Sequence, residues 1–182
     1  PRPIGWISSI SPNGYINLAP YSFFNAVGSE PPMMMFSSTG AQPRATKDTV
    51  KNIESTGEFV CNMVTWDLRD QMNATSAPAP ADVNEFELAE LEMEPSQLVK
   101  PPRVKAAPIH MECTYIQTVK MPCDMPGGRN VMIIGQVIGI QINDEFLVGG
   151  KIDIESIQPL ARMGYQDYSS VEKIFTLKRP IK

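Results

Sequence analysis

The 182-residue sequence predicts a mainly β domain, an antiparallel or Greek-key β-barrel with short helices. Three observations favour this class over a parallel α/β sheet. About seven segments carry the apolar and β-branched residues, often alternating with polar ones, that are typical of strands. Turn-forming residues separate these segments, and the 17 prolines of the chain lie largely in the linkers. One of the two longest segments also carries glycines where a barrel strand must bend.

The first two strands are expected to form a hairpin. Residues 4–10 alternate with a period of two, so Trp6 and Ser9 should face opposite sides of a strand. The turn 11–14 ends in an Asn-Gly pair, which tolerates a positive φ. Residues 15–18 should therefore return as the antiparallel partner.

A loop, a further strand and the first helix should follow. Residues 17–25 are rich in asparagine, proline and aromatic side chains and are interpreted as a loop, and residues 33–36 form a short apolar strand. The helix is expected over residues 46–56, where Thr46 or Asp48 could cap its start.

A helical excursion interrupts the strands in the middle of the chain. Gly57 should end the first helix in the left-handed conformation, after which residues 58–64 return to a strand. Residues 67–102 are then expected to leave the sheet as helices and loops. Asp67 could cap one of these helices, and Asn84 resembles the first residue of a capping box. The excursion is too small and too poor in apolar residues to be a separate domain.

The two longest strands are expected over residues 109–119 and 131–142, joined by a segment rich in proline and glycine. Gly135 and Gly139 in the second of these strands mark a bulge, a sharp bend or a close approach of the backbone. These features suit a barrel. A last strand is expected over residues 171–177.

Composition limits the classes of function. With 42% apolar residues, 20% charged residues and a net charge of −4, the chain fits one soluble globular domain over residues 1–182. It has no basic field of the kind that binds nucleic acid. No apolar segment approaches the about 20 residues of a membrane span, and the start has no secretory apolar region, so a cytoplasmic location is expected. Because Pro1 enters a strand, we also expect that an N-terminal segment is missing from this sequence.

The histidine and cysteine content argues against a metal site and against a disulfide framework. The only histidine, His110, lies in an alternating segment and is interpreted as packed or hydrogen-bonded. Cys61, Cys113 and Cys123 lack CxxC spacing, which favours buried free thiols. The sequence has neither a GxxxxGK[ST] nor a GxGxxG motif, so neither a nucleotide hydrolase nor a Rossmann dehydrogenase is indicated.

Two segments could build a ligand site together, and the first is the loop 17–25. Three aromatic residues, Tyr21, Phe23 and Phe24, are interleaved there with small polar residues. Pro20 fixes its own φ and lacks an N–H, so the carbonyls and amides beside it can be held in place for the edge of a flat heterocycle. The alternative is a loop that covers the core with buried aromatic side chains.

The second segment is residues 36–40 together with the helix start that follows. Hydroxyl groups leave the strand, and Lys47 lies with Thr46 and Thr49 at the beginning of the predicted helix. Free N–H groups and the helix dipole favour an anion such as phosphate at this position. The alternative is ordinary capping with solvated Lys47 and Arg44. An aromatic, amide-rich loop and a phosphate site together are what a phosphorylated planar cofactor needs.

At these residues the sequence resembles the flavin reductase-like, FMN-binding split-barrel family. The matching stretches follow the family's order and extend over nearly the whole chain. They are RPIGWISS at 2–9, NLAPYSFF at 17–24, KDT at 47–49 with Asn52 and Ile53, TGEFV at 56–60 with Asn62, and PLAR at 159–162. The resemblance implies an antiparallel Greek-key split β-barrel and a homodimer with FMN close to the subunit interface.

The resemblance also implies a set of cofactor contacts. Trp6, Ser8 and Ser9 would lie along the flavin. The isoalloxazine edge would contact Ala19, Pro20, Tyr21 and Ser22, with Asn17 on the same strand end. The ribityl phosphate would be surrounded by Ser37, Ser38, Lys47, Asp48 and Thr49, with Asn52 nearby. Arg162, the catalytic candidate, and Tyr168 would approach the cofactor or the nicotinamide. One departure is that Gly164-Tyr165 stands where the family has Gly-Gly.

The implied activity is that of an FMN-dependent NAD(P)H oxidoreductase of the flavin reductase type. The flavin accepts hydride at N5, and the protein binds, orients and tunes it. A nicotinamide would stack on the open face of the ring and leave before an acceptor binds. Two alternatives stay open: a flavoredoxin-like carrier that exchanges electrons with a redox partner protein, and a noncatalytic barrel that binds another small anion. No metal is expected.

Overall fold

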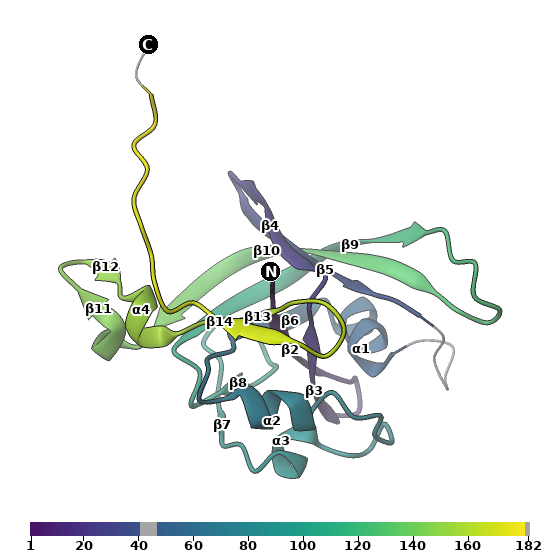
Figure 1. Cartoon of the computed structure of the whole chain (residues 1–182). Coiled ribbons are helices and arrows are strands. Elements are labelled where there is room, and N and C mark those ends of the chain that lie inside the picture. The colour runs from purple at the N-terminus through teal and green to yellow at the C-terminus, as the bar shows by residue number, and fades with distance from the viewer. Residues whose placement is uncertain (41–46, 181–182) are drawn as a thin grey trace.

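A seven-stranded antiparallel sheet is the main element of the computed structural model, which describes residues 1–40 and 47–180 (Figure 1). The strand order is β3-β2-β6-β9-β10-β5-β4. Consecutive strands β3 and β4 are at opposite ends of this order and are not paired, so the barrel is split between them. The predicted antiparallel split barrel is confirmed. The strands are β2 (Gly5–Ile10), β3 (Ile16–Tyr21), β4 (Phe24–Ser29), β5 (Pro32–Ser38), β6 (Glu58–Met63), β9 (Ile109–Met121) and β10 (Asn130–Ile142).

Smaller sheets and short helices surround the main sheet in the described residues. A three-stranded sheet joins the two parts of the chain nearest its ends, β1 (Arg2–Pro3), β13 (Leu160–Arg162) and β14 (Tyr168–Ser170). Two short ribbons pair β7 (Met93–Glu94) with β8 (Arg103–Val104) and β11 (Leu147–Val148) with β12 (Lys151–Ile152). The helices are α1 (Asp48–Thr56), α2 (Arg69–Ala74), α3 (Glu85–Leu88) and α4 (Ile154–Ile157), with a 3-10 turn η1 (Asp144–Phe146).

Two hydrophobic clusters lie on opposite faces of the β2–β3 hairpin. Because side chains alternate along a strand, Ile7 contributes to one cluster and its neighbour Trp6 to the other. The barrel cluster is filled by strand residues and α1, and includes Ile7, Tyr21, Phe36, Val50, Ile53, Phe59 and Ile133. The excursion cluster is covered by the helices of the 67–102 segment, and includes Trp6, Leu18, Met72, Phe86 and Val104. The excursion is therefore a second layer on the sheet.

Two glycines of β10 lie at irregularities of the sheet, as predicted. The pairing of β10 with β9 shifts register next to Gly135 and again next to Gly139. A Cβ atom on Gly135 would lie 2.4 Å from a ring carbon of Phe59, whereas one on Gly139 would lie 2.7 Å from a methyl group of Leu98. Gly135 therefore lets the Phe59 ring pack directly on the backbone of β10.

Two expected elements differ from the structure. Strand β3 continues through Pro20 to Tyr21, so the loop expected over residues 17–25 is only the two-residue turn Ser22-Phe23. Proline is accepted because β3 is an end strand, where a missing N–H leaves no ladder bond unmade. The strand expected over 171–177 is absent, because the last strand, β14, lies earlier in the chain and ends at Ser170. Residues 171–180 instead extend away from the body of the molecule (Figure 1).

The helix starts also differ in part from the expected caps. The N-cap of α1 is Lys47 rather than Asp48, and Thr46 lies outside the described residues. The N-cap of α2 is Leu68 rather than Asp67, and neither the Lys47 nor the Leu68 side chain makes a capping hydrogen bond. By contrast, Asn84 caps α3 as predicted, because its Oδ1 accepts a hydrogen bond from the Phe86 amide. Gly57 follows α1 with φ 77°, as predicted.

The single histidine and the cysteines are buried or half-buried as predicted. His110 Nε2 is 2.8 Å from the Val104 carbonyl, and burial lowers the pKa of this histidine. Cys61 and Cys113 are buried free thiols, and Cys123 is half-buried. Burial raises the pKa of Cys61 to about 12, so it stays a thiol at neutral pH. Across residues 1–40 and 47–180, no helix is long and apolar enough for a membrane crossing, and no group of His, Cys, Asp and Glu could hold a metal ion.

The close packing at Gly135 generates a stability prediction. Gly135→Ala is expected to lower the free energy of unfolding by about 1–3 kcal/mol. The new methyl group overlaps the Phe59 ring, so the ring or the backbone of β10 must move. Thermal unfolding should show this as a fall in Tm of roughly 2–4 °C per kcal/mol. Gly164→Ala is the matched control, since nothing lies within 4 Å of its added Cβ. Equal Tm values for the two variants would contradict the assignment.

Candidate functional site

The two segments singled out in the sequence meet at the turn between β3 and β4. Lys47, at the start of α1, places its Nζ atom 5.3 Å from the centre of the Tyr21 ring. The Ser37 amide at the end of β5 donates a hydrogen bond of 2.8 Å to the Phe23 carbonyl in the turn. The end of β3, the end of β5 and the start of α1 therefore converge. We call this place the Lys47–Tyr21 site.

The ammonium group of Lys47 lacks a counterion in the described part of the chain. The side chain is half-buried, and partial burial lowers the pKa of this lysine. The ammonium group lies over the aromatic face of Tyr21, and no carboxylate of the described residues lies within ion-pair distance of it. A partly desolvated cation without an anion is unfavourable, and an anionic ligand would remove that penalty.

The hydroxyl group of Tyr21 is a second unsatisfied group at the same place. The side chain is buried, and its Oη atom makes no hydrogen bond of good geometry with residues 1–40 and 47–180, although the Thr49 side chain lies close enough to act on its pKa. Burial raises the pKa of Tyr21 far above its usual value of 10.0, so the hydroxyl keeps its proton. The ring itself is fixed by Phe36, whose centroid is 4.6 Å away. The oxygen is enclosed, and the Thr49 side chain at the start of α1 is its polar neighbour, so Tyr21 forms the floor of the site beneath Lys47.

The start of α1 offers backbone donors beside these two side chains. The first helical hydrogen bond runs from the Lys51 amide to the Lys47 carbonyl, at 3.1 Å. The amides of residues 48–50 precede it and thus have no acceptor within the helix. Asp48, one of the expected phosphate neighbours, is the first helical residue. A nine-residue helix without a side-chain cap presents this end to an anion.

Four of the predicted site residues form hydrogen bonds with one another. Asn17 Nδ2 donates to Thr49 Oγ1 at 2.9 Å, and Asn52 Nδ2 donates to Ser9 Oγ at 3.2 Å. All four side chains are buried. These two bonds tie α1 to the β2–β3 hairpin and so fix Lys47 above Tyr21. Their role in the structure is to position the site.

Trp6 and Ser8 do not reach the Lys47–Tyr21 site, contrary to the expectation that they lie along a flavin there. Both are completely buried on the opposite face of β2. Trp6 Nε1 donates to Thr75 Oγ1 at 2.9 Å, and Ser8 Oγ donates to the Pro102 carbonyl at 2.6 Å. The alternation of β2 explains the difference, because only Ser9 shares the face of the barrel cluster.

The remaining predicted contacts of the ring edge and phosphate line the same turn. Ala19, Pro20 and Ser22 are half-buried, as is Ser37, whereas Ser38 is buried. Ser22 Oγ accepts a hydrogen bond of 3.4 Å from Arg2 Nε. Arg2 is a site residue that sequence reasoning missed.

Arg2 carries a positive charge at the rim of this site. Its guanidinium group lies 5.3 Å from the centre of the Phe23 ring. The signal that could have found it is its place in the matching stretch 2–9, where no role was expected for it. The charge thus lies beside the turn that was expected to contact the ring edge.

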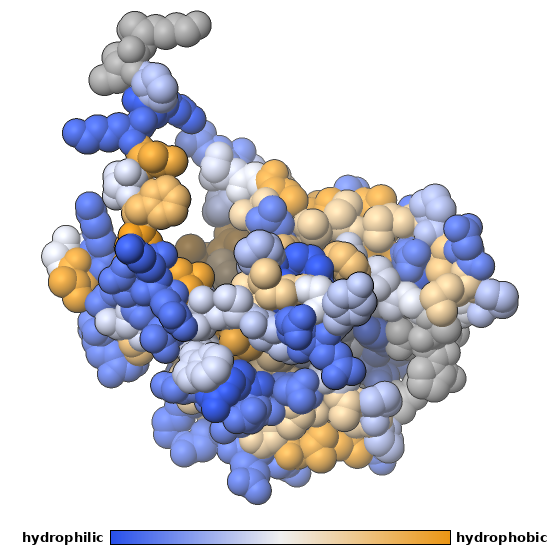
Figure 2. Space-filling view, viewed as in Figure 1, coloured by the Kyte–Doolittle hydropathy of each residue, from blue (hydrophilic) through white to orange (hydrophobic). Residues whose placement is uncertain are grey.

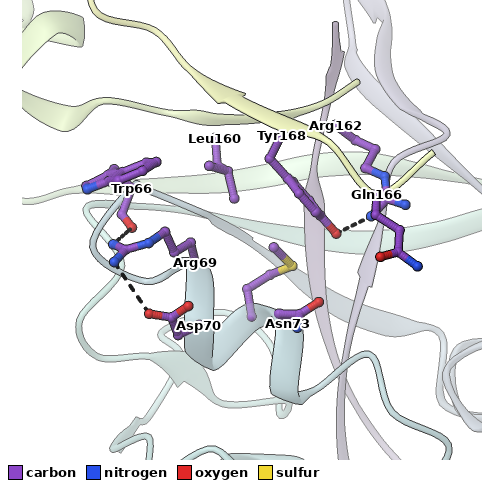
Figure 3. A pocket seen from close by; sticks show the side chains of 9 residues that line it. Trp66, Arg69, Asp70, Asn73, Leu160, Arg162, Gln166 and Tyr168 are labelled. Atoms are coloured by element: carbon purple, nitrogen blue, oxygen red, sulfur yellow. Dashed lines mark hydrogen bonds and ion pairs between the residues drawn. The ribbon is translucent and has the colours of Figure 1, made fainter. Parts of the chain in front are cut away.

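Arg162 and Tyr168 lie together in a different place, a cavity of about 560 Å³ between α2 and the β13–β14 hairpin (Figure 3). The Arg162 guanidinium is 4.5 Å from the centre of the Tyr168 ring and donates hydrogen bonds to the Tyr168 hydroxyl and the Tyr165 carbonyl. Sequence reasoning missed Trp66 and Arg69, which also line it. They lie far from PLAR in the sequence and belong to no motif.

Tyr165, which stands where the resemblance leads us to expect a glycine, has an unusual backbone conformation. Tyr165 adopts φ 52°, a left-handed conformation that glycine adopts at no cost and that costs another residue about 1 kcal/mol. Its side chain is 96% exposed, so no packing within this chain compensates. The conformation accompanies the bond that the Tyr165 carbonyl accepts from Arg162.

Comparisons with known proteins identify a family model, relatives and solved structures that are similar to this chain. The model of the flavin reductase like domain matches residues 1–153. A protein of Aquifex aeolicus is 41% identical over 169 residues, which cover 92% of this chain and 83% of that protein. The crystal structure of nitrilotriacetate monooxygenase component B from Bacillus cereus superimposes with a TM-score of 0.89 at 30% identity, over 97% of this chain and 87% of that one. The 2-nitrobenzoate 2-nitroreductase NbaA of Pseudomonas fluorescens gives 0.84 at 27% identity, over 99% and 85%.

The unpaired Tyr21 hydroxyl can be tested without a ligand. Tyr21→Phe is expected to leave the ligand-free protein as stable as the parent or to stabilise it by about 1 kcal/mol, because it removes a buried polar group that has no partner. Tyr115→Phe is the matched control and should destabilise, since the Tyr115 hydroxyl pairs with Thr118 Oγ1 at 2.9 Å. Urea unfolding measures both. A larger loss for Tyr21→Phe would contradict the unpaired state.

Proposed function

The chain belongs to the flavin reductase-like family, and we propose that it binds FMN and uses it to oxidise NADH or NADPH. The observation that carries this proposal is the Lys47–Tyr21 site. It combines a cation without a counterion among the described residues, an aromatic ring beneath that cation, and a helix start whose N-cap side chain makes no capping bond. The phosphate of a planar cofactor would satisfy the cation and the helix start. Two similar proteins, the monooxygenase component B and the nitroreductase, are consistent with this redox class.

The residues present fit FMN by the chemistry of their donors. Lys47 and the first amides of α1 would hold the phosphate, together with the hydroxyls of Ser37 and Ser38 at the end of β5. The ring would lie toward the β3–β4 turn, with Tyr21 and the half-buried Ser22 among its neighbours. Each of these groups is a hydrogen-bond donor, which matches the acceptor-rich phosphate and ring carbonyls.

Bound FMN supplies the hydride-accepting chemistry in this proposal. The residues of the chain would bind the FMN, orient it and favour negative charge on its ring. Tyr21 keeps its proton because burial raises its pKa, so its hydroxyl acts as a donor at any physiological pH. Arg2 adds a positive charge beside Ser22 and Phe23, which favours negative charge developing at a ring edge there. No imidazole takes part, since His110 is buried and bonded to the Val104 carbonyl.

A homodimer is also proposed, and exposed apolar side chains support it. Residues 171–180 form a tail that stands off the body and carries apolar side chains (Figure 2). Ile174, Phe175 and Leu177 in this tail are 54%, 81% and 82% exposed. The described part of the chain covers about half of Ile174 and little of Phe175 and Leu177. A second copy that packs against the tail would bury this area, which is worth about 25 cal/mol per Å².

The proposed function has a direct spectroscopic test. The purified protein is expected to be yellow or to become yellow with added FMN, and anaerobic NADH or NADPH should bleach its absorbance near the visible flavin maximum. Retention of FMN without bleaching by either nucleotide would indicate an electron carrier instead. A protein that takes up no FMN at all would overturn the proposal.

The phosphate role of Lys47 predicts a ligand-specific defect. Lys47→Met should weaken FMN binding by about 10- to 100-fold, because a charge-assisted hydrogen bond is lost, and should change riboflavin binding by less than about twofold. Lys51→Met is the matched control, since Lys51 is exposed one turn further along α1. Isothermal titration of the flavin-free protein measures both ligands. An equal loss for FMN and riboflavin would exclude phosphate contact.

A further inference from the structure

The cavity between α2 and the β13–β14 hairpin contains two arginines that are each stacked on an aromatic ring. The Arg69 guanidinium lies 4.3 Å from the Trp66 ring, and that of Arg162 lies 4.5 Å from the Tyr168 ring. Figure 3 shows the two pairs on opposite sides of the cavity. Both rings are partly exposed, at 44% for Trp66 and 36% for Tyr168. The cavity therefore offers two flat surfaces together with two positive charges.

The charge of the cavity is positive although the whole chain is acidic. Asp70 is the carboxylate that lines it, and its Oδ2 lies 3.5 Å from Arg69. The Asp70 side chain is 81% exposed, so water screens this pair strongly. Arg162 donates only to neutral oxygens, those of Tyr168 and Tyr165. An anion in the cavity would thus meet Arg162, which has no carboxylate partner among the described residues, and Arg69, whose charge Asp70 neutralises only weakly.

Neutral parts of the cavity favour a nucleoside rather than a bare anion. The side chains of Met72 and Leu160 form an apolar part of the lining. Amide groups of Asn73 and Gln166 face the same space and make no hydrogen bonds within the described residues (Figure 3). Amides pair with base edges and with ribose hydroxyls. A volume of about 560 Å³ also lies within the range of small-molecule sites.

The cavity is adjacent to the Lys47–Tyr21 site through the short sheet β1-β13-β14. Arg162 of β13 is paired with Arg2 of β1, and neighbouring strands lie about 4.8 Å apart. Arg2 in turn contacts Ser22 and Phe23 at the β3–β4 turn. The other wall is fixed as well, because the Trp66 amide donates to the Gln158 carbonyl at 3.0 Å. Contacts through Arg162 and Arg2 therefore connect this cavity to the β3–β4 turn.

From these observations we propose that the cavity binds the adenosine diphosphate half of the hydride donor, with the adenine on Trp66 or Tyr168 and a phosphate on Arg69. The proposal rests on the proposed function for the identity of the donor. It assigns Trp66, Arg69 and Asn73 to donor binding, and it adds an electrostatic reason for affinity that the ring site alone does not give. Arg69 is not required for FMN retention, because FMN lies at the Lys47–Tyr21 site.

The test uses ADP-ribose, which has the proposed half of the donor but cannot deliver hydride. Titration into the FMN-loaded protein should release or absorb heat and quench tryptophan fluorescence, because Trp66 lines the cavity whereas Trp6, the other tryptophan, is completely buried. Arg69→Met should weaken ADP-ribose binding and raise the KM for NADH or NADPH, each by about tenfold or more, without loss of FMN. Arg69→Lys should restore part of the loss. Trp66→Phe should abolish the fluorescence response to ADP-ribose but retain most of the heat of ADP-ribose binding.

Lys151→Met, which removes an exposed charge on β12, is the control and should match the parent. If ADP-ribose fails to bind while NADH or NADPH still bleaches the flavin, the cavity assignment is overturned and the proposed function stands. If ADP-ribose binds in an Arg69-dependent way but neither nucleotide bleaches the flavin, the cavity assignment stands and the proposed donor chemistry fails. Equal weakening by Arg69→Met and Lys151→Met, or binding of riboflavin in place of ADP-ribose, would also overturn the assignment.

Discussion

The docking of α1 on the β2–β3 hairpin is the interaction on which the rest of the structure depends. Two buried amide-to-hydroxyl bonds, Asn17 to Thr49 and Asn52 to Ser9, set the position of the helix, and Val50 and Ile53 fill the barrel beneath it. Each bond contributes about 1 kcal/mol, but leaving either amide unpaired in this interior would cost more. These contacts therefore fix α1 in one position, with its first turn over the Tyr21 ring.

The strand pattern also explains which parts of the fold and the site could be predicted from the sequence. The hairpin, the two long strands and the bulged glycines follow from a period of two and from local glycine chemistry, and both are short-range properties. The end of β3 was mistaken for a loop because Pro20 usually breaks a strand, whereas only the sheet order reveals that β3 is an end strand. The 171–177 segment has strand-like residues, but it leaves the body of the molecule after β14, and no local pattern predicts that path.

Within the site, the residues close in sequence were easier to predict than the ones close only in space. Lys47 and Tyr21 were expected together because one strand separates their segments, and the structure places them 5.3 Å apart. Trp6 and Ser8 were expected from their place in a motif, but a motif does not tell which side of β2 a side chain occupies. Trp66 and Arg69 meet Arg162 only through the pairing of residues 64–66 with 158–160, which no local pattern encodes.

The distribution of charge ties the two sites together. A chain with a net charge of −4 places Lys47 and Arg2 around the β3–β4 turn, and Arg162 and Arg69 in the cavity between α2 and the β13–β14 hairpin. Partial burial of Lys47 without a carboxylate partner among the described residues is unfavourable, whereas stacking on aromatic rings offsets part of the hydration that the arginines lose. The left-handed Tyr165 adds a backbone strain that accompanies the Arg162 bond. In the function that we propose, an anionic, aromatic ligand held at these two places would compensate the positive charges that the described residues leave without carboxylate partners.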